Sequence, residues 1–205
     1  MRIAWTIVVG CLMLGSAAAV TPRIWVQDTQ DAFLKGEADG VSISREGSVT
    51  IGPRVETFGE TGESFVWSLA RHESTVYVGT GNEGRIYKIS PDGTADLLFD
   101  SPEIGIFSLA VGSNGTVYAG SSPDGLIYAI APGKEPQTLA RTGDHHVWAL
   151  SLAKGKIYAA TGGQQGKVVA VSLDGTVETV LEVADANVVS LLCTSDGRIY
   201  AGTDT

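Results

Sequence analysis

Short apolar runs alternate with turn-forming residues along most of this chain, and the pattern repeats about every 41 residues. Each of the first three repeats opens with an almost wholly apolar run and continues with three further short runs rich in β-branched and aromatic residues, which are typical of strands. Asp-Gly and Asn-Gly pairs separate the runs, as at residues 92–93, and both pairs favour tight hairpins. The pattern predicts units of four short antiparallel strands. The opening runs are residues 66–70, 106–110, 147–151 and 188–192.

A tyrosine follows each opening run at a nearly fixed distance. Successive tyrosines are 41, 40 and 42 residues apart, and a repeat of ~40–45 residues built of strands and turns is typical of a propeller blade. We therefore predict an all-β fold, a β-propeller of four-stranded blades, in which these tyrosines pack between neighbouring blades. The tyrosines are Tyr77, Tyr118, Tyr158 and Tyr200.

Large rings also recur at one position of the opening runs, as Trp67, Phe107 and Trp148. Repetition at a structural position is typical of packing, so we predict that these three rings lie in the core between blades. The propeller itself does not define a function, because this architecture supports enzymes, receptors and scaffolds alike.

The repeat divides the chain into a leader, a lead-in segment and a propeller. Residues 1–19 have the features of a signal peptide, residues 20–40 precede the repeat, and the propeller spans residues 41–205. Within the propeller we predict a partial blade at 41–60, blades at 61–100, 101–140 and 141–181, and an incomplete blade at 182–205.

The last repeat stops at Thr205, directly after its second strand. One explanation is that residues 41–58 supply the missing outer strands and close a ring of four blades. The other explanation is that the chain is an N-terminal fragment of a larger propeller. We favour the fragment, because four blades is the low extreme for this architecture.

The leader has the three parts of a secretory signal peptide. Arg2 supplies the positive charge, residues 3–14 form an apolar run, and small residues precede a cleavage site near Ala19. We therefore predict a periplasmic or secreted protein with no transmembrane segment in the mature chain. A lipoprotein anchored through Cys11 is the less favoured alternative, because residues 8–11 resemble a lipobox.

The chain is acidic, with 23 Asp and Glu residues against 14 Lys and Arg residues and a formal net charge of −9. Such a chain repels nucleic acid, so we exclude nucleic acid as a partner and expect the field of the protein to favour cations. Cleavage near Ala19 would leave Cys193 as the one cysteine, which excludes a disulfide framework.

One carboxylate stands three residues before each opening run. In a propeller this connection lies on one face beside the central channel, so four equivalent carboxylates would form a ring at the channel mouth. Oxygen ligands of this kind suit Ca²⁺ or Mg²⁺, although no cofactor is certain. The alternative is that each carboxylate only caps backbone amides of its own loop. The four are Glu63, Glu103, Asp144 and Asp185, and Asn82 and Asp124 belong to the same polar face.

Asp144 is followed by His145 and His146, and no other repeat has histidine at this point. A carboxylate beside two imidazoles is chemically able to bind a metal ion or a ligand, or to act as a base. Adjacent residues of a strand point to opposite faces, so we expect only one of the two rings to face the channel. An ordinary loop role is the alternative.

Residues 76–94 read Val-Tyr-Val-Gly-Thr-Gly-Asn-Glu-Gly-Arg-Ile-Tyr-Lys-Ile-Ser-Pro-Asp-Gly-Thr. This unit resembles the repeats of bacterial extracytoplasmic β-propellers. It is similar to those of the two-component-regulator sensor propellers, of NHL-type proteins and of the gluconolactonase and streptogramin-lyase group. The likeness covers residues 41–205 and implies a propeller of no single family. Lactonase-like members imply a divalent metal held by Glu, Asn and Asp, but these ligands have no one-to-one counterparts here.

Together these features predict an exported, non-catalytic propeller that serves as a ligand-binding, sensor or protein-interaction module through its acidic channel-mouth face. Its partner is a protein or small molecule of unknown identity, and no catalytic residue is predicted. One alternative is a divalent-metal-dependent, lactonase-like hydrolase or lyase. Another alternative is a purely structural envelope protein. Metal-dependent turnover of lactones distinguishes the enzyme from the other two.

Overall fold

The structure is a computed structural model, and it describes residues 26, 28–53, 56–184 and 187–204. The predicted signal peptide, its cleavage site near Ala19 and the lipobox cysteine Cys11 lie outside the described residues. The chain forms two compact units, residues 1–56 and residues 57–205, which are described separately below.

The first unit contains one helical turn and one hairpin in its described part. Helix α2 (Gln30–Phe33) begins at Thr29, whose Oγ1 accepts a hydrogen bond from the backbone N–H of Ala32 at 3.3 Å. Strands β1 (Val41–Ile43) and β2 (Val49–Ile51) pair in antiparallel fashion.

Strands dominate the second unit, and they form three four-stranded antiparallel sheets and one two-stranded sheet within the described residues. We call these sheets blades one to four. Blade one is β3 (Val66–His72), β4 (Thr75–Thr80), β5 (Arg85–Ile89) and β6 (Ala95–Asp100). Blade two is β7 (Gly105–Val111), β8 (Val117–Ser122), β9 (Leu126–Ile130) and β10 (Gln137–Arg141). Blade three is β11 (His146–Ala153), β12 (Lys156–Gly162), β13 (Gly166–Val171) and β14 (Val177–Val183). Blade four is β15 (Val188–Cys193) and β16 (Ile199–Thr203).

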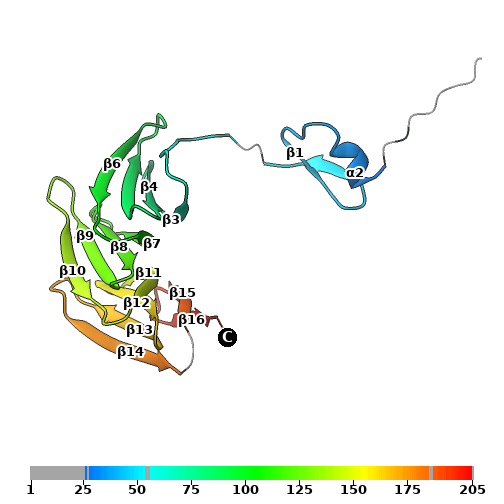
Figure 1. Cartoon of the computed structure of the whole chain (residues 1–205). Helices are drawn as coiled ribbons and strands as arrows, with labels where there is room; N and C mark the ends of the chain where they lie inside the picture. The colour runs from blue at the N-terminus through cyan, green and yellow to red at the C-terminus, as the bar shows by residue number, and fades with distance from the viewer. Residues whose placement is uncertain (1–25, 27, 54–55, 185–186, 205) are drawn as a thin grey trace, which may run out of the picture. The chain divides into compact units, whose positions relative to one another are not determined.

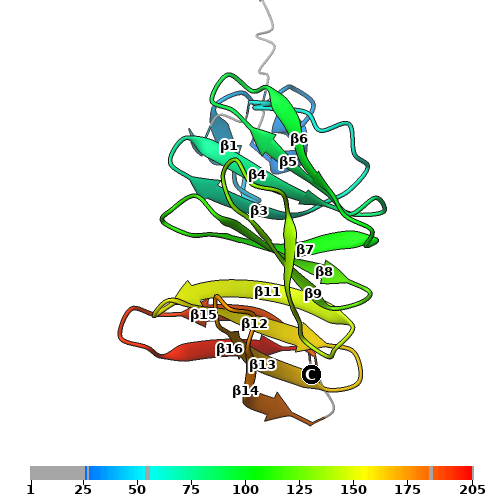
Figure 2. The ribbon, with the colours of Figure 1, turned by 90° about the vertical axis from the view of Figure 1, so that its left-hand side faces the viewer.

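Each four-stranded blade is a meander in which neighbours in sequence are neighbours in the sheet. The blades follow one another along an arc, with the first strands β3, β7 and β11 on the inner side and the last strands β6, β10 and β14 on the outer side (Figure 1). Figure 2 shows blades one, two and three stacked in sequence order. The four opening runs predicted as strands are therefore confirmed as β3, β7, β11 and β15, with ends that differ by at most two residues.

The apolar core lies between the blades. Alternate residues of a strand point to opposite faces, so one strand serves two interfaces. In β8, Val117 and Ala119 pack in the cluster that joins blades one and two, whereas Tyr118 packs in the cluster that joins blades two and three. A third cluster, which includes Val188, joins blades three and four. The predicted packing of the repeated tyrosines between blades is confirmed for Tyr118, which is 8% exposed.

The β1–β2 hairpin closes with the same turn as the outer hairpins of the blades. In this turn the backbone N–H of Ser44 donates to the carbonyl of Ser48 at 2.9 Å, as Ser90 donates to Thr94. Gly47 has a φ of 80°, a left-handed value that favours glycine. In blades two and four the hairpin between the first two strands uses the same hydrogen bonds, with Gly112 or Thr194 in place of serine at the first turn position. The assignment of residues 41–60 to a partial blade stays a prediction.

No helix among the described residues is long and apolar enough to cross a membrane. Cys193, the one cysteine in the described part of the chain, is free and half-buried at the end of β15.

Candidate functional site

The connections that enter the first strand of each blade lie on the same face as the connections between its second and third strands. Contacts between neighbouring blades link these connections: Ser101 Oγ donates to the carbonyl of Gly84 at 2.7 Å and accepts from the N–H of Glu103 at 3.3 Å. Thr142 repeats both contacts one blade later, with Gly125 and Asp144. We call this side of the second unit the loop face.

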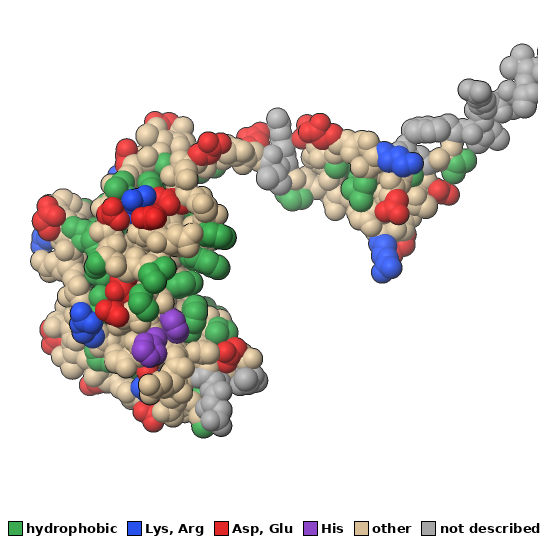
Figure 3. Space-filling view, in the orientation of Figure 1, with side chains coloured by type: hydrophobic (Ala, Val, Ile, Leu, Met, Phe, Trp, Pro, Cys, Tyr) green, Lys and Arg blue, Asp and Glu red, His purple; other side chains and the backbone are tan. Residues whose placement is uncertain are grey.

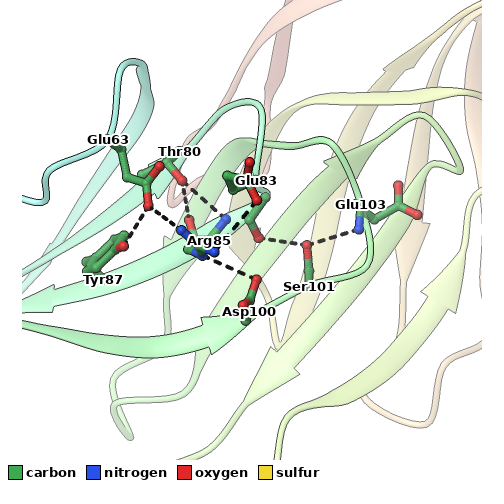
Figure 4. Close-up of polar contacts among 9 residues, drawn as sticks. Glu63, Thr80, Glu83, Arg85, Tyr87, Asp100, Ser101 and Glu103 are labelled. Atoms are coloured by element: carbon green, nitrogen blue, oxygen red, sulfur yellow. Dashed lines mark hydrogen bonds and ion pairs between the residues drawn. The ribbon is translucent and has the colours of Figure 1, made fainter.

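Glu63, the first of the predicted carboxylates, is held by two side chains of β5 in its own blade (Figure 4). The hydroxyl of Tyr87 donates to Glu63 Oε1 at 2.6 Å, and Arg85 Nη1 lies 3.0 Å from the same oxygen. These donors, Tyr87 first and Arg85 second, lower the pKa of Glu63. The same hydrogen bond to Glu63 raises the pKa of Tyr87.

Arg85 forms the centre of a wider group of charges in blade one. Besides Glu63, its guanidinium lies 3.6 Å from a carboxylate oxygen of Glu83 and 3.5 Å from one of Asp100. The hydrogen bond to Glu63 is the main reason that the pKa of Arg85 is raised. Three carboxylates around one guanidinium leave this part of the loop face acidic.

Glu103, the equivalent residue of blade two, is buried, with 6% of its surface exposed. Its Oε2 accepts from the hydroxyl of Ser121 at 3.1 Å and from the backbone N–H of Asp124 at 3.0 Å. Leu126 stands at the blade position that Arg85 occupies in blade one, so this position supplies no cation to Glu103.

Tyr128 stands at the position of Tyr87, but its buried hydroxyl has no hydrogen-bond partner. Burial first, and the charge of Glu103 second, raise the pKa of Tyr128 to about 12. The tyrosine hydroxyl that donates to the carboxylate of Glu63 in blade one therefore has no hydrogen-bond partner in blade two.

Asp144 of blade three is again paired with a cation. Thr161 Oγ1 donates to Asp144 Oδ2 at 2.6 Å, and Lys167 Nζ lies 2.9 Å from Oδ1. The Asp144 side chain is 5% exposed and that of Lys167 is 23% exposed. Lys167 occupies the same blade position as Arg85. Blades one and three therefore both pair the carboxylate with a cation from this position, whereas blade two has Leu126 there.

The three described carboxylates, Glu63, Glu103 and Asp144, each accept hydrogen bonds inside their own blade, chiefly from side chains. No three His, Cys, Asp or Glu residues are arranged to hold a metal ion in the described part of the chain. Binding of Ca²⁺ or Mg²⁺ stays a prediction. The fourth carboxylate, Asp185, lies outside the described residues. Asn82 and the side chain of Asp124 are exposed on the loop face.

His145 and His146 lie beside Asp144 at the start of blade three, with ring centroids 6.0 Å apart. His145 is exposed, whereas the ring of His146 lies against Trp148 at a centroid distance of 4.7 Å. His146 Nδ1 is 2.7 Å from the Oγ of Ser122 in blade two, so this histidine links two blades. Burial first, and the nearby His145 second, lower the pKa of His146.

A shallow pocket of about 280 Å³ opens beside these residues. It offers carboxylate, imidazole, amide and ammonium groups to a ligand. Its lining residues are Gly143, Asp144, His145, Gln164, Gln165 and Lys167.

A β-bulge interrupts the first strand of each blade at one equivalent residue. In blade one the pairing of β3 with β4 shifts between Val66 and Ser68, so Trp67 is left without a partner residue on β4. Phe107 and Trp148 are skipped in the same way in blades two and three. A bulge re-aims the extra side chain, and here it repeats in successive blades.

The three re-aimed rings contact one another across the blades. The ring centroids of Trp67 and Phe107 are 5.3 Å apart, and those of Phe107 and Trp148 are 5.1 Å apart. Phe65 stacks on Trp67 at 5.9 Å and begins the row. We call Phe65, Trp67, Phe107 and Trp148 the aromatic strip. Figure 3 shows hydrophobic side chains gathered along the inner side of the second unit, with histidine side chains near them.

The prediction of a buried core position is therefore wrong for Trp67, which is 52% exposed, although the contacts between blades are present. A sequence signal for this orientation exists, since Trp67 and Trp148 are each followed by a glycine fourteen residues later. A Cβ at Gly81 would lie 2.0 Å from Trp67 Nε1, and one at Gly162 would lie 2.6 Å from Trp148 Nε1. The glycines leave room for the indole rings.

No protein-family model matches the chain, and no curated protein matches it by sequence. Solved structures do match. Virginiamycin B lyase from Staphylococcus aureus is 13% identical with a TM-score of 0.58, and the match covers 78% of this chain and 55% of that chain. A streptogramin B lyase is 15% identical with a TM-score of 0.59, over 78% of this chain and 54% of that chain.

The extracellular domain of a one-component system from B. thetaiotaomicron is 17% identical with a TM-score of 0.56, over 68% of this chain and 20% of that chain. This chain thus spans about half the length of the two lyases and a fifth of the one-component system chain. Likeness at such low identity shows the fold alone. The chain therefore has the β-propeller fold that its repeat predicts, similar to the lyases and to this extracellular domain and assigned to no single family.

Proposed function

We propose that the second unit is an exported, non-catalytic binding module that contacts its ligand or protein partner through the aromatic strip and the adjoining loop face. The observation that carries this proposal is the bulge at the same residue of three successive first strands. An ordinary sheet would direct these rings into a neighbouring blade. The bulge instead brings the rings of Trp67, Phe107 and Trp148 together in one row across the blades, and Trp67 is 52% exposed.

The chemistry of this surface favours ligands that combine an apolar or aromatic body with a positive group. Aromatic faces attract cations, and exposed rings contribute large apolar contact area at small cost in side-chain entropy. The acidic groups around Arg85 and the net charge of −9 act in the same direction. Together they favour a partner that presents arginine or lysine beside aromatic side chains.

The neighbours give context to this proposal. One neighbour is an extracellular sensor domain, and the others are lyases. A periplasmic or secreted location of this chain agrees with the sensor domain and belongs to the proposal. The lactonase-like or lyase alternative and the structural alternative remain predictions, and turnover of a cyclic ester in the presence of a divalent metal would favour the first of them.

A binding experiment with defined peptides tests the proposal. Isothermal titration calorimetry compares a short peptide of alternating arginine and tyrosine with the same peptide carrying glutamate in place of arginine. We expect saturable binding of the arginine peptide only. Trp67→Ala should weaken this binding at least about tenfold, which corresponds to about 1.4 kcal/mol.

Leu173→Ala is the matched control, because Leu173 is 62% exposed but lies in the turn between β13 and β14, away from the loop face. Binding should survive in this variant. No saturable binding of the arginine peptide, or equal binding by the parent and the Trp67→Ala protein, would overturn the proposal.

A further inference from the structure

The buried carboxylate of blade three divides its contacts between its two oxygens. Oδ2 of Asp144 accepts a hydrogen bond from the hydroxyl of Thr161 at 2.6 Å, and Oδ1 lies 2.9 Å from Nζ of Lys167. The hydroxyl thus engages one oxygen and the cation engages the other. Because the side chain of Asp144 is 5% exposed, this cation compensates a charge that is almost completely withdrawn from water.

Blade two repeats the first half of this arrangement. Ser121, at the position of Thr161, donates to Oε2 of Glu103 at 3.1 Å. The backbone N–H of Asp124 donates to the same oxygen at 3.0 Å. By the pattern of blade three, Oε1 of Glu103 is the oxygen that faces the position of the cation. Leu126, which has no donor, stands at that position in place of lysine or arginine.

The tyrosine beside this carboxylate supplies a second, independent observation. In blade one the guanidinium of Arg85 interacts with both the carboxylate of Glu63 and the hydroxyl of Tyr87. Tyr128 of blade two, at the position of Tyr87, is 3% exposed and its hydroxyl has no hydrogen-bond partner. A buried hydroxyl without a partner costs free energy that a bound donor recovers. Glu103 and Tyr128 therefore present two acceptor oxygens at the place where blade one binds its guanidinium.

Two arginines lie near this place, and within the part of the chain that the structure describes neither forms an ion pair with Glu103. Figure 4 shows the carboxylate of Glu103 directed away from Arg85 of blade one. Arg141 on β10 is the pairing partner of Leu126, but its side chain is exposed. The hydrogen bonds that Glu103 accepts from these described residues come from neutral donors.

We propose that Glu103 and Tyr128 form a binding site for one positive group of the partner, a guanidinium or an ammonium that carries N–H donors. In blade two this group takes the position that Arg85 and Lys167 occupy in blades one and three. The side chains of Arg85 and Lys167 are 32% and 23% exposed, so the position opens to solvent on the loop face. The proposal rests on the proposed function for the kind of partner, and it adds the point at which the partner's positive charge binds.

A small guanidinium compound without an aromatic ring tests this site separately from the aromatic strip. Nα-acetyl-arginine amide carries one positive charge, and ¹⁹F nuclear magnetic resonance of the protein labelled with fluorotyrosine reports its binding. The chain has six tyrosines, and Tyr128→Phe assigns the resonance of Tyr128. We expect a saturable shift of this resonance in the parent. The uncharged analogue, Nα-acetyl-citrulline amide, should cause no shift.

Two variants should remove the site. Glu103→Gln should weaken binding at least about tenfold, because charge-assisted hydrogen bonds are about twice as strong as neutral ones. Leu126→Arg should abolish binding, because the chain then supplies its own guanidinium. Glu135→Gln is the matched control, since Glu135 is exposed in the turn between β9 and β10 of the same blade. Binding should survive there, and unchanged resonances of the other tyrosines show that each variant is folded.

The outcomes separate this site from the proposed function. Absence of a shift of Tyr128 in the parent, or equal binding by the parent and Glu103→Gln, would overturn the proposal even if the arginine–tyrosine peptide binds at Trp67. Binding that appears only after Arg141→Gln would also overturn it, because Arg141 then occupies the position. A shift of Tyr128 in a protein whose peptide binding does not depend on Trp67 would support the site and contradict the proposed function.

Discussion

The hydroxyl of Tyr87 donates a 2.6 Å hydrogen bond to Oε1 of Glu63. The same blade position holds Tyr128 one repeat later, where the hydroxyl is buried without a partner. Blades with nearly the same backbone thus differ in whether the tyrosine hydroxyl at this position has a hydrogen-bond partner. This difference leads to opposite expectations for the same substitution.

Tyr87→Phe should destabilise the protein by about 1 kcal/mol, because it removes a donor to a carboxylate at a partly exposed site. Tyr128→Phe should be neutral or slightly stabilising, because it removes a buried hydroxyl that makes no hydrogen bond. Urea unfolding of the two variants beside the parent measures both. Equal destabilisation would show that Tyr128 has a partner in solution.

Replacing the carboxylates of Asp144 and Glu103 by amides should also change the free energy of unfolding by different amounts. Asp144→Asn leaves the ammonium of Lys167 without its 2.9 Å partner, so we expect a loss of about 1–3 kcal/mol in the free energy of unfolding. Glu103→Gln leaves no cation behind and keeps an acceptor for Ser121, so its loss should be smaller. The double variant Asp144→Asn/Lys167→Met should recover part of the loss. A larger loss for Glu103→Gln would argue against this account.

Stability should fall below about pH 6.5 because of His146. Its pKa is lowered in the folded protein, so the unfolded chain binds the proton first as the pH decreases. The unfolded state then holds more protons than the native state, and stability rises with pH in this window. Chemical unfolding of the parent and of His146→Asn at pH 7 and pH 5 measures the effect. An unchanged pH dependence in the variant would exclude His146 as its source.

Glu63 acts at lower pH with the same sign. Its folded-state pKa is lowered, so its contribution is present above the unfolded value and is lost as the pH falls through the folded value. The two groups therefore act in separate windows, with His146 acting first during acidification. A Glu63→Gln variant should therefore be less stable than the parent at neutral pH, and the difference should shrink as the pH falls through the acid range.

Divalent cations test the predicted ring of carboxylates. Because Glu63, Glu103 and Asp144 each accept hydrogen bonds from donors in their own blade, we expect millimolar Ca²⁺ or Mg²⁺ to leave the melting temperature unchanged. Differential scanning calorimetry with and without a chelator measures this. Stabilisation by the cation that disappears when these three residues are replaced by amides would instead favour the ring.

The strands and hairpins could be predicted because their signals are local. The opening run at 66–70 and the Asp-Gly pair at 92–93 define a strand and a turn within a few residues. The loop positions of the carboxylates also follow from the repeat. The partners of the carboxylates do not follow from the repeat. Arg85 is 22 residues from Glu63, and the residue type at its blade position changes from one blade to the next.

The orientation of the aromatic strip could not be predicted from alternation. Period two would place Trp67 between blades, but a bulge shifts the register between Val66 and Ser68 by one residue. The bulge depends on backbone pairing with β4, which apolar patterning does not encode. The glycines at positions 81 and 162 are the sequence signals that point to this orientation of the rings.

The most direct test of the proposed binding surface is ¹⁹F nuclear magnetic resonance of the protein labelled with fluorotryptophan, during titration with the arginine–tyrosine peptide. The chain has four tryptophans, and Trp67→Phe and Trp148→Phe assign the resonances of the two that belong to the aromatic strip. The account predicts saturable changes at both tryptophans, and none with the glutamate peptide. Binding that leaves both resonances unchanged would place the ligand elsewhere on the protein and contradict the account.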